Sequence, residues 1–135
     1  TFKKRRCKMK ITNKWLETKR ACVDGKAWVA GQDTDDAVEL IRRLLEYRPD
    51  WAVWLMARID NLEVLRQADV NAKNNNGATA LMLAAENGYK DTIRTLIAAG
   101  ADVNAKNNYG ATVLMWAAQR GYAKVVSLLK KSGAK

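Results

Sequence analysis

The chain has 135 residues, of which 48% are hydrophobic, enough to bury one moderate core in a soluble globular body. No apolar run approaches the ~18 residues that a membrane span needs, and no signal peptide begins the sequence, so we expect no membrane partner. The chain lacks His, and its only cysteines, Cys7 and Cys22, form no C-x-x-C pair, which argues against a metal site. Free thiols suit a reducing cytoplasm, and a Cys7–Cys22 disulfide is the alternative.

Positive charge is in excess and concentrated near the start of the chain. The sequence holds 24 Lys and Arg against 14 Asp and Glu, a formal net charge of +10. Residues 1–10 form a basic arm whose cations suit nucleic-acid phosphates: Lys3, Lys4, Arg5, Arg6, Lys8 and Lys10. Short basic runs are also common as solvated tails, and no motif with base-contacting spacing accompanies this one. Nucleic-acid binding is therefore the alternative function.

Residues 11–67 are expected to form a helical module. Thr12 or Asn13 can cap a first helix that runs to the region of Arg20, and Asp24 can cap a second helix that ends at Gly31. A third helix is expected to open at Thr34 and to bury one periodic face, which carries Val38, Ile41, Leu44 and Leu45.

The remaining helices of this module follow from a proline and from a second capping position. The third helix should end near Tyr47, because Pro49 suits the first turn of the next helix. The buried face of that next helix is expected to hold Trp51, Trp54, Leu55 and Ile59. Asp60 or Asn61 can then start a last short helix, LEVLRQ.

Four tryptophans lie at helical spacing in this module: Trp15, Trp28, Trp51 and Trp54. Such a cluster can be a ligand box or an aromatic recognition surface. At helical spacing it is more often core, and we expect these side chains to supply buried apolar surface.

The remaining chain consists of two copies of one repeat unit. Residues 68–100 and 101–133 align without a gap and agree at 19 of 33 positions. In each unit a Gly and a Thr cap, Gly77 with Thr79 and Gly110 with Thr112, precede a short apolar helix. A second glycine and a second amphipathic stretch follow, so each unit should be a helix, a turn, a helix and a loop.

The string ADVNAKNNNGATALMLAAENGY resembles the ankyrin repeat, whose pattern runs G-x-T-P-L-H-x-A-A-x-x-G and is followed by G-A-D-V-N. The resemblance covers residues 68–135 and implies an all-α fold, a short ankyrin-repeat solenoid with a helical N-terminal cap. The proline of the pattern is Ala80 or Val113 here, and its histidine is Met82 or Met115. We therefore expect looser helix starts and more reliance on apolar packing between units.

Both ends of this solenoid need covering, because a stack of about three units is required for stability. NLEVLRQADVN resembles a shortened second helix of the repeat, so residues 50–67 are interpreted as a degenerate repeat within the capping module. Residues 10–66 are also similar, more weakly, to a helical module at the start of bacterial and phage proteins. At the other end Lys130 and Lys131 replace Ile97 and Ala98, so the second unit is expected to serve as the C-terminal cap.

No catalytic set stands out in the sequence. Without His, the usual base for a Ser or Cys nucleophile is missing, and no phosphate-binding glycine motif is present. Asp33, Asp35 and Asp36 could hold a cation, but they lie where negative charge favours a helix start. We expect a non-enzymatic protein without a cofactor, and a catalytic N-terminal module is a third hypothesis.

The resemblance also indicates where a partner would bind, because ankyrin proteins usually use their loop tips and the exposed side of the first helix. The corresponding residues are Asn75, Asn76, Ala78, Glu86, Asn87, Asn108, Tyr109, Ala111, Gln119 and Arg120. The second unit gains Tyr109 and Arg120 at these positions, and both are residue types enriched in binding hot spots. The leading hypothesis is a protein-interaction module or scaffold, and an acidic partner would suit Arg120.

Overall fold

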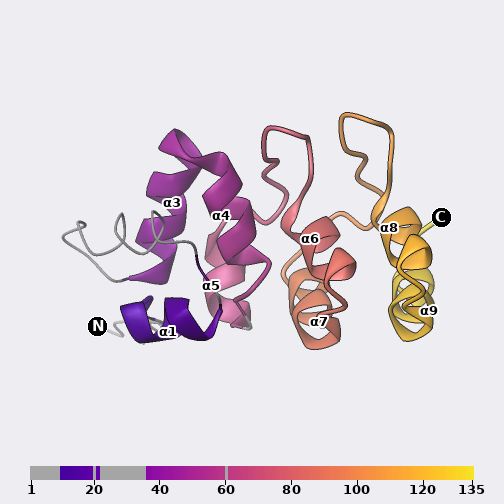
Figure 1. The fold of residues 1–135 in the computed structure, drawn as a ribbon, viewed down its shortest axis with the longest axis horizontal. Coiled ribbons are helices and arrows are strands. Elements are labelled where there is room, and N and C mark those ends of the chain that lie inside the picture. The colour runs from indigo at the N-terminus through magenta and orange to yellow at the C-terminus, as the bar shows by residue number, and fades with distance from the viewer. Residues whose placement is uncertain (1–9, 20, 22–35, 60) are drawn as a thin grey trace, which may run out of the picture.

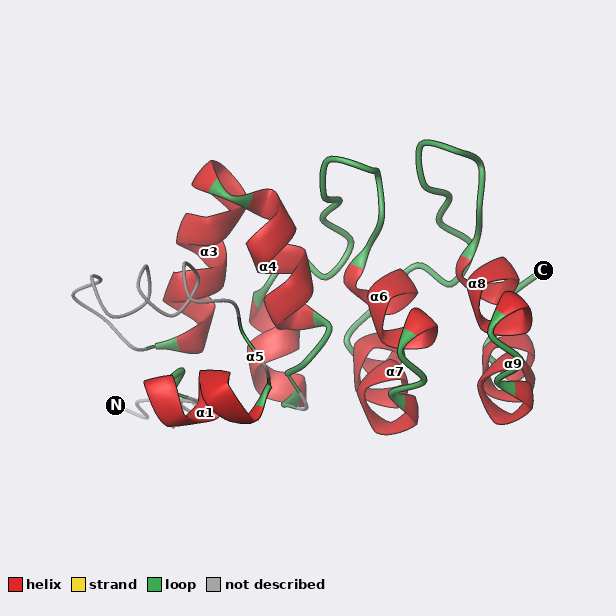
Figure 2. Cartoon of the chain, viewed as in Figure 1, coloured by secondary structure: helices red, strands yellow, loops and turns green. Residues whose placement is uncertain are grey.

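The computed structural model describes residues 10–19, 21, 36–59 and 61–135, and within these ranges the chain is all-helical (Figure 2). Pairing of the β type is limited, in this part of the chain, to isolated bridges between Lys10 and Asp36 and between Lys106 and Thr112. Helix pairs follow one another along the long axis of the molecule, as a short solenoid should (Figure 1). The expected fold class, an all-α solenoid, is confirmed. No helix in the described ranges is long and apolar enough to cross a membrane.

The two repeat units have the same helices in the same places. The first unit holds α6 (Ala80–Glu86) and α7 (Lys90–Ala98), and the second holds α8 (Val113–Gln119) and α9 (Ala123–Lys131). The Thr79 hydroxyl accepts a hydrogen bond from the Met82 amide at 3.4 Å, and Thr112 does the same for Met115 at 3.3 Å. Both helix starts are thus capped as predicted, without the proline of the family pattern.

The helices before the repeats are α1 (Asn13–Thr18), α3 (Ala37–Tyr47), α4 (Pro49–Met56) and α5 (Leu62–Gln67). Thr12 caps α1 and Asn61 caps α5, in agreement with the sequence, and Pro49 occupies the first turn of α4. The cap of α3 is Asp36, whose carboxylate accepts from the Glu39 amide at 3.1 Å, so this helix does not open at Thr34. The helix expected after Asp24 lies outside the described residues.

The tryptophans of this module are less buried than we predicted. Trp15, Trp51 and Trp54 are only half-buried, and Trp28 lies outside the described residues. The Arg48 guanidinium lies 3.8 Å from the ring centroid of Trp51, and that of Arg58 lies 4.2 Å from Trp54. Each ring therefore packs on the core with one part and carries a cation on another.

Smaller aliphatic side chains fill the space that we assigned to the tryptophans. Leu40, Ile41 and Leu44 of α3 are buried, whereas Val38 and Leu45 are half-buried. In α4 the buried residues include Ala52, Val53, Leu55 and Met56. Leu40, which our sequence reasoning missed, lies three residues after Ala37 and four before Leu44 and therefore shares their face of the helix.

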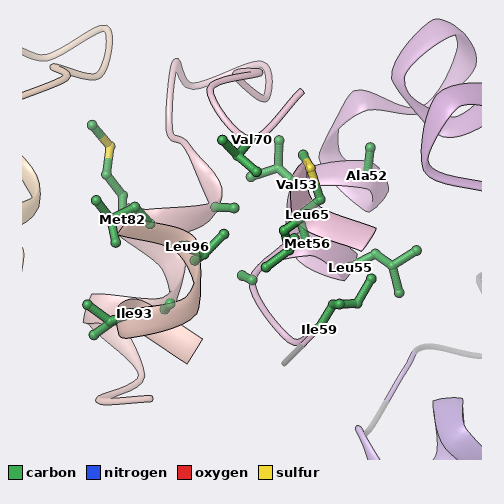
Figure 3. Packing of buried hydrophobic residues seen from close by; sticks show 14 of the residues in the cluster. Ala52, Val53, Leu55, Met56, Ile59, Leu65, Val70, Met82, Ile93 and Leu96 are labelled. Atoms are coloured by element: carbon green, nitrogen blue, oxygen red, sulfur yellow. The ribbon is translucent and has the colours of Figure 1, made fainter. Parts of the chain in front are cut away.

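The repeats stack directly on the N-terminal helices. Helix α4 contacts α6, α5 contacts α7, and α6 in turn contacts α8. Leu96 lies on the side of the first unit that faces Met56 and Leu65, while Met82 points to the opposite side, where the second unit follows (Figure 3). One apolar core therefore runs from Ile11 to Leu129.

Candidate functional site

The loops that precede α6 and α8 project in parallel from the same side of the stack (Figure 1). The Asn74 side-chain oxygen accepts from the amides of Asn76 and Ala78, each at 3.0 Å. In the second loop, Asn107 accepts in the same way from Tyr109 at 2.9 Å and from Ala111 at 3.0 Å. Asn at the start of the turn thus gives both loops the same shape by bonding its own backbone.

Asparagines also join each loop to its neighbour. Asn75 donates from its amide and from Nδ2 to the Asp50 carboxylate at the start of α4, at 3.0 and 2.9 Å. One unit later, Asn108 donates from Nδ2 to the Asn75 carbonyl and from its amide to the Asn76 carbonyl, each at 3.0 Å. Asp50, Asn75 and Asn108 therefore form a polar ladder that runs from the start of α4 across the two loops, and this ladder holds the loops in register.

Hydrogen bonds within the chain and burial engage four of the ten predicted binding residues. Asn75 and Asn108 are exposed, but their side-chain amides are used between loops. Asn87 turns its side chain back to the Leu83 carbonyl at 2.8 Å. Ala78 is only 2% exposed and cannot contact a partner, contrary to our expectation. Ala78 closes the base of the loop, where its amide donates to Asn74 Oδ1 and its carbonyl accepts from the Asn74 amide.

Five of the other six predicted residues line one groove of about 670 Å³. They are Glu86, Tyr109, Ala111, Gln119 and Arg120. Glu86 comes from the end of α6, Gln119 and Arg120 from the end of α8, and Tyr109 and Ala111 from the second loop. The groove therefore lies between the two units and is open to solvent on the loop side. Asn76 is exposed on the neighbouring loop, outside the groove lining.

Two groove residues were missed by sequence reasoning. Asn107 also lines the groove, while its side chain shapes the loop through the bonds described above. Trp116 is half-buried, packs against the core and also lines the groove. Its replacement of Leu83 at the matching position of the first unit was the signal that could have identified it.

Charge in the groove is balanced by an ion pair between the two units. Arg120 Nη2 lies 2.8 Å from Glu86 Oε1. Because both side chains are partly exposed, this bond holds the groove walls in place more than it stabilises the fold. Arg120, which we expected to suit an acidic partner, is thus already paired within the chain, but a guanidinium has five N–H donors and this bond uses one.

The remaining sequence candidates fall mostly outside the described residues. These are Lys3, Lys4, Arg5, Arg6 and Lys8 of the basic arm, together with Cys7, Cys22, Asp33 and Asp35. Lys10 is exposed and its backbone pairs with that of Asp36. Asp36 itself caps α3. Within the described ranges no three His, Cys, Asp or Glu side chains gather as a metal site would require.

Comparison with known families agrees with this geometry. A family model described as ankyrin repeats in three copies matches residues 29–135, which is more than half of the chain. No curated protein matches the sequence. Ankyrin repeats are generally protein-protein interaction modules, and the family is typically non-enzymatic. The 33-residue period, the paired helices and the matched segment lead to one conclusion: the chain belongs to the ankyrin-repeat family.

Proposed function

We propose that this chain is an interaction module that binds a partner polypeptide in the groove between the second loop and α8. The observation that carries the proposal is the exposure of Tyr109, whose side chain is 81% exposed at the edge of this groove. Tyr109 lies there with Trp116 and Arg120, the three residue types that most often supply binding hot spots. At the matching positions the first unit has Asn76, Leu83 and Asn87.

The chemistry of the groove indicates what a partner must offer. Trp116 and Tyr109 give apolar surface for one or two hydrophobic side chains, and Gln119 adds a neutral donor and acceptor. The free N–H groups of Arg120 can donate to a carboxylate or to a backbone carbonyl of the partner. An acidic partner is favoured by the net charge of +10, which acts over a longer distance than the paired Arg120.

The test compares two double variants that remove the same chemistry at different places. Tyr109→Ala with Arg120→Ala removes groove contacts. Tyr47→Ala with Arg94→Ala is the matched control, because Tyr47 is also exposed and Arg94 is also in an exposed ion pair, with Asp91. Both variants should keep the free energy of unfolding within about 1 kcal/mol of the parent, since all four residues are surface residues.

The measurement is affinity isolation with the parent as bait, followed by titration of each retained protein with both variants. We expect the groove variant to weaken binding by about tenfold or more and the control variant to change it by less than about twofold. Equal affinity of parent and groove variant for every retained protein would place the binding surface elsewhere.

A further inference from the structure

A second hollow, of about 790 Å³, lies on the other side of the first unit. It is lined by residues from the end of α1, by Arg58 and by the segment around the start of α7. It shares no lining residue with the groove of the proposed function. Three of its lining side chains are cations: Lys19, Arg58 and Lys90. They come from three separate segments, so the fold, and not a run of sequence, brings them to one place.

None of these three cations has a carboxylate within 4 Å among the residues that the structure describes. Arg58 is half-buried, stacks on Trp54 at 4.2 Å, lies 5.8 Å from the ring centroid of Tyr89, and donates from Nη1 to the Trp54 carbonyl at 3.2 Å. Burial lowers its pKa below the usual value, because the charged form is less well solvated there. The guanidinium is thus fixed in place and partly desolvated, with N–H donors to spare.

Among the described residues that line the hollow, the carboxylate is that of Asp91. It is largely exposed and already pairs with Arg94 at 3.6 Å, on the surface of α7. The described residues of the lining thus carry three positive side chains and one negative side chain, a net charge of +2. A phosphoryl group carries close to two negative charges at neutral pH and offers three acceptor oxygens.

We propose that this hollow binds a phosphoryl dianion through Lys19, Arg58 and Lys90. Arg58 supplies the oriented donors, because a guanidinium presents its N–H groups in a planar fork that matches a phosphate. Lys19, whose Nζ lies 5.7 Å from the Trp15 ring centroid, and Lys90 at the start of α7 supply ammonium groups. The hollow is larger than inorganic phosphate alone, so the group can be carried by a small organic molecule or by a phosphorylated side chain. This proposal stands independently of the partner groove.

The experiment is an NMR titration of the full, ¹⁵N-labelled chain with inorganic phosphate and, separately, with O-phosphoserine, at constant ionic strength. Serine is the matched control ligand. We expect saturable shifts of the backbone amides of Gly88 to Thr92 and of the Arg58 side chain with both phosphates and none with serine. Tighter binding of O-phosphoserine would identify an organic phosphate as the ligand, and equal affinity would identify the free anion.

Two charge-matched variants localise the effect. Lys19→Gln with Lys90→Gln should weaken phosphate binding by about tenfold or more, because two charge-assisted contacts are lost. Lys130→Gln with Lys131→Gln removes the same charge from exposed positions of α9 and should leave the affinity within about twofold. The proposal is overturned if the parent shows no saturable shift by about 20 mM phosphate, or if both variants lose affinity equally.

Discussion

The first and second repeat units share 19 of 33 residues and have helices with matching bounds, but their burial differs. Met82 in the first unit is 0% exposed, whereas Met115 at the same position of the second unit is 57% exposed. Ala85 is buried and its counterpart Ala118 is exposed. The first unit has helices against both of its sides, while the second unit contacts α6 on one. The same residue therefore contributes a different amount to the free energy of unfolding, depending on its neighbours in the stack.

This contrast bears on our expectation that the second unit serves as a C-terminal cap. Lys130 and Lys131 are exposed, as a cap requires, but Ala98, the counterpart of Lys131, is exposed as well. The exposed Met115 is apolar surface that a cap would usually replace by a polar group. We propose that α4 and α5 act as the first unit of the stack, because they contact α6 and α7 in the order in which units follow each other.

The largest expected effect comes from truncating the two matched methionines. Met82→Ala should lower the free energy of unfolding by about 2–4 kcal/mol, because it leaves a cavity between two units. Met115→Ala should lower it by less than about 1 kcal/mol, because that side chain is already in water. Urea unfolding followed by circular dichroism measures both. Equal losses would show that Met115 is buried in solution, by a second molecule or by another segment.

A glycine pair tests the loops in the same way. Gly77 and Gly110 have φ of 75° and 78°, so alanine is strained at both positions. At Gly77 a Cβ would also lie 2.7 Å from the Asn108 amide nitrogen, whereas at Gly110 it would meet no atom within 4 Å. Gly110→Ala should therefore cost about 1 kcal/mol and Gly77→Ala about 2–3 kcal/mol. Similar unfolding free energies for the two variants would mean that the loops are not held together as the ladder requires.

The sequence predicted those parts of the fold that depend on local chemistry. Thr12, Asn61, Thr79 and Thr112 cap helices because a hydroxyl or amide oxygen three residues before an amide can satisfy it. Pro49 opens α4 because its fixed φ suits a first turn. The repeat period then predicted where the helices and loops of the second unit lie from those of the first.

Features that depend on distant residues were not predictable in this way. Asn75 bonds to Asp50, which is 25 residues away in the sequence, and Arg120 bonds to Glu86, which is 34 residues away. A local sequence pattern therefore cannot predict either pair. Trp51 and Trp54 are half-buried and each carries an arginine stacked on its ring, an arrangement that hydrophobicity alone does not indicate. The groove was predicted only in part for the same reason. The family positions identified most of its lining residues, but only the folded structure shows which predicted side chains already bond to other parts of the chain.

The smallest expected effect concerns the ion pair that joins the two units, Glu86 with Arg120. A double-mutant cycle with Glu86→Gln and Arg120→Gln should give a coupling of about 0.2–1 kcal/mol, because both groups are partly exposed. Asp91 with Arg94, a 3.6 Å pair within α7, is the matched control and should couple more weakly than the 2.8 Å pair. Raising the salt to about 1 M should reduce both couplings. A coupling above about 2 kcal/mol for Glu86 and Arg120 would mean that the pair is desolvated and contributes substantially to the stability of the stack. The apolar contact of Met82 would then not be the dominant interaction between the two units.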